Sequence, residues 1–276
     1  MRKCRRLNAR AWNYFSFFIF FTRMNYFAFC QGDLLLTADR KIPQDLRGVV
    51  EWQPWRTKME FSAPGGTPCI ALKLDSPVCK DGYVMMGLRE SFDVLDSESY
   101  MLAGKARELL YWNDNTHYCG VCGAPMAFHT NISKRCENCG KEVWPSIAVA
   151  IIVAITRGNE ILLVQSKNFR GDYMGLVAGF VETGETLEDC VMREAQEETG
   201  ISIRNIQYAG SQAWPYPSGL MVGFTAEYES GELRIQRSEL NKGGWYPIDN
   251  LPAIPGKVSL ARQLIDKIVA KFESQQ

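Results

Sequence analysis

Histidine is nearly absent from this chain of 276 residues, which has only His117 and His129. With so few imidazoles, we do not expect a catalytic triad built on histidine. A charge excess of one sign is also missing, because Lys+Arg and Asp+Glu both number 31. No overall field attracts polyanions, which argues against a dedicated nucleic-acid coat protein, although local basic patches are compatible with this composition.

Long hydrophobic runs are missing as well. The first 23 residues carry several Arg and Lys side chains and no acid, and their aromatic run from Tyr14 to Phe21 is too short to span a bilayer. A basic segment before a short apolar one also fits a signal peptide, but no small-residue cleavage site follows it. We expect translation to start at Met24 and residues 1–23 to be a misassigned extension or a disordered, apolar leader, with a signal peptide or membrane anchor as the alternative.

Cysteine is present, but not in the pattern of a disulfide framework. Four of the nine cysteines form two CxxC pairs and the others are scattered. This usage suits a reducing compartment. We therefore expect a cytoplasmic protein that does not bind a membrane.

The chain is long enough for more than one domain. Hydrophobic residues make up 46% of it and can fill a sizeable core. After the leader we place an N-terminal domain at residues 24–113, a cysteine-containing ribbon at 114–145 and a C-terminal domain at 146–276.

Short apolar runs between Gly, Pro and Asp predict a small strand-rich sheet in the N-terminal domain. The runs are 34–36, 69–72 and 83–86. The segment from Asp96 to Asn113 predicts a helix with a mixed apolar face. Arg89, before this helix, fits either a surface residue or a phosphate clamp, because Arg suits bidentate phosphate contacts but is also common on surfaces.

Two CxxC pairs separated by thirteen residues indicate a closed metal site. The four cysteines are Cys119, Cys122, Cys136 and Cys139. Four thiolates bind one structural zinc tetrahedrally, at Zn–S distances of about 2.3 Å, and leave no open position for substrate. The alternative, two reducible thiol pairs, requires both spacings to be accidental. Neither histidine is needed as a ligand.

A ribbon of this kind can also contact nucleic acid. Lys134, Arg135 and Lys141 give weak support to an RNA-contacting role. This role is the competing hypothesis for the segment.

The clearest helix signal in the C-terminal domain runs from Thr186 to Thr199. Thr186 and Asp189 resemble a capping box, and Gly200 is a natural residue to end the helix.

One face of this helix changes from apolar to acidic along its length. At 100° per residue the face consists of Leu187, Cys190, Val191 and Ala195, joined by Glu194 and Glu198, with Glu197 beside it. Carboxylates aimed inward repel one another and are costly unless a cation meets them, so a hard divalent metal such as Mg²⁺ or Mn²⁺ is the expected partner. The alternative is a solvated acidic helix in which Arg193 makes ordinary surface pairs.

The rest of the C-terminal domain predicts a mixed sheet between helices. Strands are expected at 146–155, 161–165, 176–178, 203–209, 221–228 and 233–235, and a last helix at 259–272. Gly179 follows the third strand, where the missing side chain lets the backbone turn sharply beside a ligand.

A proline-stiffened loop lies about ten residues beyond the acidic helix. Trp214 and Tyr216 alternate with Pro215 and Pro217, which gives a rigid aromatic wall on which a flat base can stack. The alternative is a turn packed into the core.

Two of these stretches resemble a known family. Residues 179–201 resemble the Nudix box, GX5EX7REUXEEXGU with U apolar, at every fixed position. The loop resembles the SQPWPFPxS signature of the NADH pyrophosphatase (NudC-type) branch, from which Ala213, Tyr216 and Gly219 depart. Tyr216 keeps the stacking face, whereas Ala213 and Gly219 loosen the loop, which bears on base preference. The resemblance covers Met24 to the end and implies an α/β fold: a C-terminal Nudix α/β/α sandwich, a four-cysteine zinc ribbon and a smaller strand-rich N-terminal domain.

The resemblance also implies roles for individual residues. Catalytic Mg²⁺ or Mn²⁺ would be bound by Glu194, Glu197 and Glu198 with the carbonyl of Ala178, and Glu239 would be a further ligand or base. Arg193 would orient a catalytic glutamate, and Glu185 would cap the motif loop. Which of Glu194, Glu198 and Glu239 is the base is left open. The dinucleotide would contact Gln212, Ala213, Trp214, Pro215, Tyr216, Pro217, Ser218, Gly219, Ala261, Trp144, Phe180 and Arg89.

The reaction implied is metal-assisted hydrolysis of the pyrophosphate in NADH or NAD⁺, giving AMP and nicotinamide mononucleotide. The first alternative is removal of the NAD cap from RNA by the same chemistry. A second, which the intact glutamates oppose, is a non-catalytic zinc-ribbon module that binds nucleotides or nucleic acid. Similar proteins are homodimers, so we expect a homodimer with one structural zinc per subunit.

Overall fold

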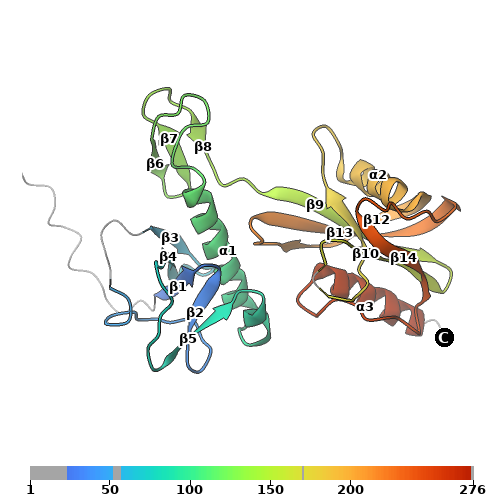
Figure 1. Ribbon diagram of the computed structural model, residues 1–276, viewed down its shortest axis with the longest axis horizontal. Helices are drawn as coiled ribbons and strands as arrows, with labels where there is room; N and C mark the ends of the chain where they lie inside the picture. Colours follow the sequence, from blue (N-terminus) through green and yellow to red (C-terminus); the bar gives the residue numbers. More distant parts are fainter. Residues whose placement is uncertain (1–23, 52–56, 170, 275–276) are drawn as a thin grey trace, which may run out of the picture. The chain divides into compact units, whose positions relative to one another are not determined.

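The computed structural model in Figure 1 describes residues 24–51, 57–169 and 171–274. Two compact units divide the chain between Met86 and Gly87. The predictions for residues 1–23 lie outside the described residues. Within the described ranges, no helix is both long enough and apolar enough to cross a membrane.

The first unit is built on a five-stranded sheet, as the short apolar runs predict. Its strands are β1 (Asn25–Cys30), β2 (Asp33–Thr37), β3 (Lys58–Ser62), β4 (Pro68–Lys73) and β5 (Tyr83–Gly87), in the order β3-β4-β1-β2-β5. Gln31 and Gly32 both have positive φ and form the two-residue turn between β1 and β2, which suits the strand twist of a hairpin. Leu35, Ile70 and Leu72 are buried in the core of this unit.

A short 3₁₀ helix, η1 (Glu90–Asp93), and the helix α1 (Ser97–Asp114) begin the second unit. The side chain of Asp96 accepts a hydrogen bond of 2.8 Å from the backbone N–H of Ser99, which caps α1 at its first turn. The predicted helix at 96–113 is therefore confirmed to within a residue.

The ribbon that follows α1 is a three-stranded sheet of β6 (Met126–Thr130), β7 (Ser133–Cys136) and β8 (Glu142–Val143). Lys134 on β7 is buried, at 2% exposure, and its Nζ donates to the carbonyls of Asn113 and Thr116 at 3.0 and 3.2 Å. A lysine ammonium at a helix C-terminus satisfies free carbonyls and favours the helix dipole. Lys134 therefore fastens the ribbon to the end of α1.

The C-terminal part of the second unit contains the large mixed sheet. Its strands are β9 (Ala148–Arg157), β10 (Glu160–Ser166), β11 (Val177–Phe180), β12 (Ile201–Ala213), β13 (Gly219–Gly231) and β14 (Leu240–Pro247). Five of them run in the order β12-β13-β9-β10-β14, and β11 pairs with β9. β13 and β9 are parallel over nine residue pairs, from Gly219–Ala148 to Glu227–Thr156.

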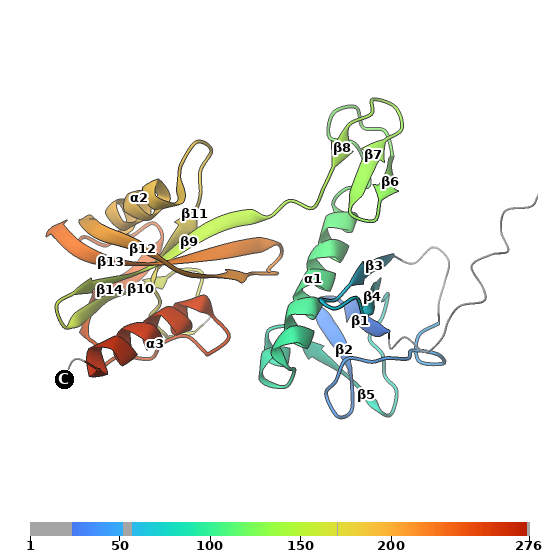
Figure 2. The ribbon, with the colours of Figure 1, turned by 180° about the vertical axis from the view of Figure 1, so that it is seen from behind.

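Helices cover both faces of this sheet, as Figure 1 and the reverse view in Figure 2 show. Ile151, Val153 and Ile155 of β9 pack in the core under α2 (Leu187–Thr199). Ile152 and Ala154 point the other way, into the core under α3 (Leu260–Glu273). Successive side chains of this buried strand point to opposite faces of the sheet and so contribute to two cores. The α/β/α sandwich is confirmed.

In the C-terminal domain, one predicted strand is wrong and one strand was missed. Residues 233–235 pair with no described strand, because Arg234 N–H donates to the carbonyl of Thr199 at 2.8 Å and Gln236 N–H to that of Glu198 at 2.9 Å. This segment caps the end of α2. The missed strand is β14, which contains Gly243 and Gly244.

Candidate active site

The ends of α2 are determined by its sequence. The Thr186 side chain accepts from Asp189 N–H at 3.1 Å, and the Asp189 carboxylate accepts from Thr186 N–H at 3.2 Å. Gly200 ends the helix with a φ of 73°, a conformation in which glycine is favoured. The predicted capping box and terminal glycine are both confirmed.

The inward face of α2 changes from apolar to acidic, as its periodicity predicts. Cys190, Val191 and Ala195 are fully buried, and Glu194 and Glu198 follow on the same face at 8% and 5% exposure. Glu197 lies to the side and is exposed. Two carboxylates are therefore buried at the centre of the site.

Gly179 on β11 makes room for the first of them. A Cβ at this position would lie 1.8 Å from Oε1 of Glu194, well inside van der Waals contact. Only a residue without a side chain allows α2 to place this carboxylate against the strand. The close approach explains the glycine more directly than the sharp turn expected from the sequence.

Arg193 links the acidic helix to the preceding loop. Its Nη1 donates to Glu194 at 2.9 Å and to Glu197 at 3.1 Å, and its Nη2 donates to the carbonyl of Phe180 at 3.0 Å. Glu185 accepts from Nε of Arg193 at 2.5 Å and also from the backbone N–H of Glu182 at 3.0 Å. The guanidinium thus restrains Glu194, and Glu185 closes the motif loop.

Burial makes the central carboxylates unusually easy to protonate. Loss of solvation, with the charges of Glu194 and Glu239, raises the pKa of Glu198 to about 8, against a lowering hydrogen bond from the backbone of Ala178. Burial also raises the pKa of Glu194, although the hydrogen bond from Arg193 opposes it. Glu239 lies close enough to act on both groups.

The donor set suits a hard divalent cation. Oε2 of Glu198 is buried without a hydrogen-bond partner, which is costly unless a cation or a proton meets it. Carboxylate oxygens are the ligands that Mg²⁺ and Mn²⁺ prefer. The residues present therefore fit such an ion, with Glu194 and Glu198 at its centre.

The four ribbon cysteines form a tighter cluster. Their sulfur atoms all lie within 4.8 Å of one another, so all four can bind one metal ion without rearrangement. Gly123 and Gly140, which follow the two pairs, have φ of 72° and 74° and let each knuckle turn back on itself. The backbone N–H of Ala124, the largest influence, and a hydrogen bond with the side chain of Asn138 lower the pKa of Cys122 to about 6, which favours the metal-binding thiolate.

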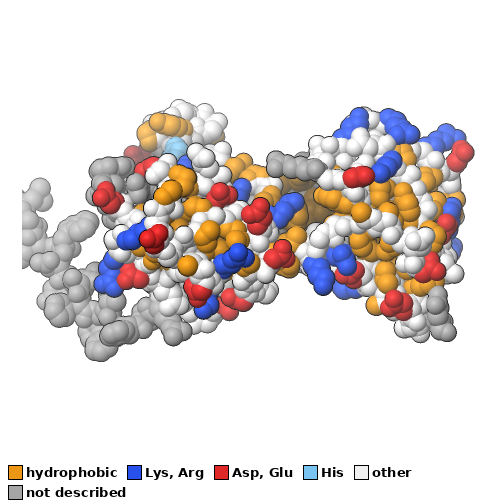
Figure 3. Space-filling model, turned by 60° about the horizontal axis from the view of Figure 1, so that its bottom comes forward, with side chains coloured by type: hydrophobic (Ala, Val, Ile, Leu, Met, Phe, Trp, Pro, Cys, Tyr) orange, Lys and Arg blue, Asp and Glu red, His pale blue; other side chains and the backbone are white. Residues whose placement is uncertain are grey.

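Two of the three cations behind the RNA-contacting hypothesis, Lys134 and Arg135, are engaged in the fold, and Lys141 is exposed. Lys134 is buried at the end of α1, and Arg135 pairs with Glu142 at 2.9 Å. The charges on which the RNA-contacting hypothesis depends are therefore largely used. Figure 3 shows acidic and basic side chains interspersed over the visible face, in keeping with the balanced composition.

The proline-rich loop between β12 and β13 presents its aromatic rings in a fixed pair. The rings of Trp214 and Tyr216 meet edge to face, with centroids 5.1 Å apart. The guanidinium of Arg89 lies 4.9 Å from the Trp214 ring centre and 4.8 Å from that of Tyr216. The structure thus brings Arg89 to the loop, as a cation over aromatic rings.

Two predicted substrate residues contribute to the start of α3. The Gln212 side chain donates to the carbonyl of Val258 at 2.7 Å and accepts from the backbone N–H of Leu260 at 2.8 Å. Ala261, next along, is buried in the same core. Gln212 therefore has a structural role, which the sequence pattern did not reveal.

Two predicted base-stacking aromatics are solvent-accessible. Trp144 follows the ribbon at 55% exposure, and Phe180 ends β11 at 66%. Phe180 is tied to the site through its carbonyl, which accepts from Arg193.

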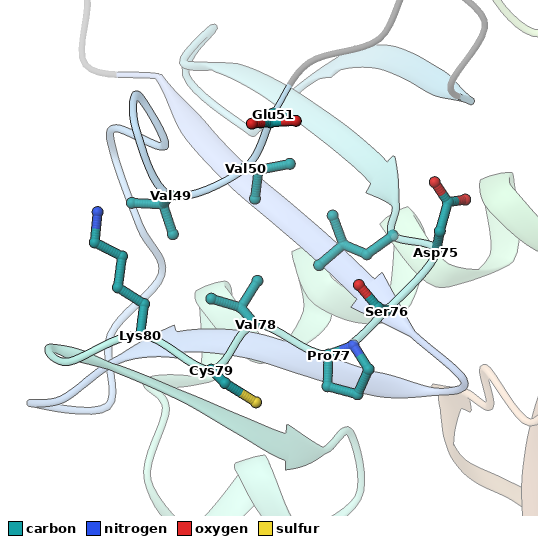
Figure 4. Close-up of a pocket in the computed structure, with 10 residues that line it drawn as sticks. Val49, Val50, Glu51, Asp75, Ser76, Pro77, Val78, Cys79 and Lys80 are labelled. Carbon is teal, nitrogen blue, oxygen red and sulfur yellow. The ribbon is translucent and has the colours of Figure 1, made fainter.

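The first unit contains a cavity of its own, drawn in Figure 4, with a volume of about 400 Å³. Val49, Val50 and Val78 form its apolar wall. Lys80 at its rim is held by the carbonyl of Gly48, to which its Nζ donates at 2.6 Å. Of the described residues around it, no three metal-ligating side chains converge, so we assign it no chemistry.

The sequence did not predict that α1 contacts the proline-rich loop between β12 and β13. Tyr100 donates to or accepts from the hydroxyl of Tyr216 at 2.9 Å, and Arg107 lies 5.7 Å from the Tyr216 ring centre. The available signal was the four-residue spacing of Tyr100, Gly104 and Glu108 along a mainly apolar helix face.

Comparison with known proteins agrees with this geometry. Residues 145–268 match the family described as "NUDIX domain", and residues 25–112 match the "NADH pyrophosphatase-like rudimentary NUDIX domain". A crystal structure of a Nudix hydrolase from Nitrosomonas europaea superposes with a TM-score of 0.50 at 19% identity, covering 56% of this chain and 92% of that one. That likeness supports the fold of the sandwich.

Curated relatives match most of the chain. A protein of Stutzerimonas stutzeri (strain A1501) named "NAD-capped RNA hydrolase NudC" is 40% identical over 238 residues, which cover 82% of this chain and 86% of the relative. The protein of the same name from Yersinia enterocolitica is 44% identical over 193 residues, covering 70% and 74%. Identity of this degree, together with the complete Nudix box on α2, leads to one assignment. The chain belongs to the Nudix hydrolases, in their NADH pyrophosphatase (NudC-type) branch.

Proposed function

We propose that this protein hydrolyses the pyrophosphate bond of NADH and NAD⁺, giving AMP and the nicotinamide mononucleotide. The observation that carries the proposal is the pair of buried carboxylates, Glu194 and Glu198, on a complete Nudix helix, with an oxygen of Glu198 left without a partner. A protein that only bound nucleotides would have no need to bury these charges.

Glu194, Glu197, Glu198 and Glu239 are the proposed ligands of Mg²⁺ or Mn²⁺, with the carbonyl of Ala178. When bound, such a cation neutralises pyrophosphate oxygens and lowers the pKa of an attacking water. Arg193 supports this arrangement by donating a hydrogen bond of 2.9 Å to Glu194, which restrains the carboxylate. The ribbon cysteines are proposed to hold a structural zinc.

A carboxylate of the same cluster takes the proton of the water. Glu198 is a candidate because its Oε2 has no hydrogen-bond partner and is available to accept the proton. Glu194 is less available, since Arg193 donates to it. Glu239, on the segment before β14, is the exposed alternative.

The dinucleotide is proposed to lie against the loop from Gln212 to Gly219 and the residue Ala261, with Arg89, Trp144 and Phe180. Exposed aromatic faces at Trp144 and Phe180 support base stacking. The cation of Arg89 over Trp214 and Tyr216 supports a contact with phosphate or with a ring.

A second candidate substrate is the NAD cap at the 5′ end of RNA. The name of the Stutzerimonas stutzeri relative supports it, since that protein is called an NAD-capped RNA hydrolase. The bond cleaved and the residues required are the same for both substrates. With Lys134 and Arg135 engaged in the fold, the RNA chain would need other contacts.

A homodimer is also proposed. Exposed apolar side chains on the ribbon support an interface there: Tyr118, Val121 and Phe128 are all more than half exposed. Size-exclusion chromatography with light scattering tests it, and a monomer at micromolar concentration would reject it.

One assay tests the proposed reaction. The protein is incubated with NADH, ADP-ribose, ATP and NAD-capped RNA in the presence of Mg²⁺ or Mn²⁺, and products are identified by mass spectrometry. We expect AMP and reduced nicotinamide mononucleotide from NADH, and 5′-monophosphate RNA from the capped transcript. Turnover of ATP or ADP-ribose alone would reject the dinucleotide preference. If no substrate gives a product, the alternative of a non-catalytic protein that binds nucleotides or nucleic acid is favoured.

A further inference from the structure

One face of α1 contacts the aromatic loop at three places. Tyr100, Gly104 and Glu108 are spaced four residues apart, so they lie on one face of the helix. They meet Tyr216, Pro215 and Gly219, respectively. We call this set of three α1 residues the loop-facing stripe.

The first contact joins two hydroxyl groups. The phenol oxygens of Tyr100 and Tyr216 are 2.9 Å apart. The ring of Phe92 packs edge-on against Tyr100, with centroids 5.2 Å apart, and restrains it from the other side. Tyr216 stands where the family signature has Phe, so this hydrogen bond depends on a hydroxyl that the signature residue lacks.

The second contact is one of close packing. A Cβ at Gly104 would lie 3.1 Å from Cγ of Pro215. Gly104 is buried in the middle of an 18-residue helix, where glycine is unfavourable compared with alanine. The close approach of Pro215 is a reason for glycine at this position.

The third contact lies at the end of the loop. Glu108 lies beside the backbone of Gly219, the first residue of β13. Burial, the larger influence, raises the pKa of Glu108, whereas the Gly219 backbone favours the ionised carboxyl. Its Oε1 is buried without a hydrogen-bond partner. The stripe therefore contacts the loop near its middle and at its end.

The loop itself lacks two of its usual restraints. Ala213 replaces a proline and Gly219 replaces a serine of the signature, and both changes add backbone freedom. Two backbone hydrogen bonds remain in the loop, from Trp214 N–H to the carbonyl of Gly219 and from Tyr216 N–H to that of Trp214, both at 2.7 Å. Contacts from outside the loop can replace the lost rigidity.

We propose that the loop-facing stripe of α1 is a positioning element for the dinucleotide, with Tyr100 as its principal residue. The stripe holds Trp214 and Tyr216 in the arrangement that binds the base, so that binding does not have to order the loop. This inference rests on the proposed function, in which the loop contacts the substrate. It adds the element that replaces the missing proline and serine.

Removal of either hydroxyl tests the proposal. Tyr100→Phe and Tyr216→Phe should each raise KM for NADH by about three- to tenfold, the factor expected for one hydrogen bond, with little change in kcat. The double variant should be no worse than either single variant, because both remove the same bond. Tyr111→Phe, an exposed tyrosine of the same helix, is the matched control and should keep the wild-type KM.

Gly104→Ala separates positioning from stability. Alanine favours the helix, so the melting temperature should hold or rise, whereas the added methyl group should push Pro215 and raise KM by a similar factor. A purely structural role predicts that the melting temperature changes and KM does not. An unchanged KM in Gly104→Ala, Tyr100→Phe and Tyr216→Phe would overturn the proposal.

The two levels of proposal fail differently. Wild-type protein without activity on NADH would reject the proposed function. Calorimetric titration with NADH, with the catalytic divalent ion left out, measures the same affinity ratios without turnover. Weaker binding by Tyr100→Phe than by Tyr111→Phe would then still support the stripe, and equal binding would overturn it.

Discussion

The acidic cluster of α2 and the cysteine cluster of the ribbon both gather anionic ligands, but with opposite geometry. The four sulfur atoms lie within 4.8 Å of one another, and glycines shape both knuckles around them. The carboxylates of α2 are more widely spread, and one oxygen of Glu198 is left without a partner. A closed set of four ligands supports folding, whereas an open set leaves room for substrate.

The two clusters also depend on their surroundings to different degrees. The ribbon cysteines are close in sequence, within residues 119–139, and need little beyond their own turns. The acidic site needs β11, the segment before β14 and the whole of α2 to come together. Loss of a ligand should therefore disturb folding in the ribbon and chemistry on α2.

The largest effect is expected in the ribbon. Cys136→Ser should abolish zinc binding and remove a stabilisation on the order of 10 kcal/mol from the ribbon, because a structural zinc contributes its binding free energy to folding. Metal analysis and limited proteolysis within residues 114–145 measure it. Cys79→Ser, an exposed thiol of the first unit, is the control and should retain zinc. Full zinc occupancy in Cys136→Ser would contradict the claim that the four cysteines form one closed metal site.

Glu198→Gln should impair catalysis and leave the fold intact. We expect NADH turnover to fall by about 10²–10⁴-fold, the range for loss of a general acid or base, with an intact fold because the neutral amide fits the same space. Steady-state kinetics and circular dichroism give the two readouts. Glu188→Gln, an exposed residue of the same helix, should retain turnover. Activity retained in Glu198→Gln would count against this site.

Gly179→Ala should have a smaller effect on the same site. The new Cβ would overlap Oε1 of Glu194, so the carboxylate has to move, and a displacement of about 1 Å can cost about 10²-fold in rate. We expect kcat to fall by roughly that factor or less. Gly256→Ala, which meets nothing within 4 Å, is the control. Equal kcat in the two variants would show that Glu194 tolerates displacement.

The smallest effect is one of pH on stability. Because the pKa of Glu198 is raised from 4.5 to about 8 in the folded chain, its contribution to stability is fully present below pH 4.5 and is lost as the pH rises through 8. Without a divalent ion, the melting temperature should fall over this range, by about 2–4 °C for each kcal/mol. Glu198→Gln should show a shallower fall. If the melting temperatures of the wild type and Glu198→Gln change identically with pH, the raised pKa of Glu198 is contradicted.

Local signals predicted much of the site. The capping box, the apolar-to-acidic face of α2 and the cysteine spacing are all properties of contiguous segments, and the structure has each of them where periodicity places it. The two cores under α2 and α3 follow from the continuous apolar run of β9. Such features depend on neighbours a few residues away, which a sequence displays directly.

Contacts between segments that are distant in the sequence were harder to predict. Residues 233–235 were predicted to form a strand, yet the backbone N–H groups of Arg234 and Gln236 bind the last carbonyls of α2. β14 was missed because Gly243 and Gly244 weaken its strand signal, although a Cβ at Gly243 would lie 2.4 Å from Ile235. Gln212 accepts a hydrogen bond from the first turn of α3, and the residues next to it in the sequence do not predict this role.

Counting both metals in one preparation tests the central claim most directly. Zinc is measured by elemental analysis and Mn²⁺ binding by electron paramagnetic resonance, in the wild-type protein, Glu194→Gln and Glu198→Gln. The account predicts one zinc per chain in all three proteins and a Mn²⁺ site that is strongly weakened in both variants. Wild-type Mn²⁺ affinity in the variants, or loss of zinc from them, would contradict the separation of a closed ribbon site from an open site on α2.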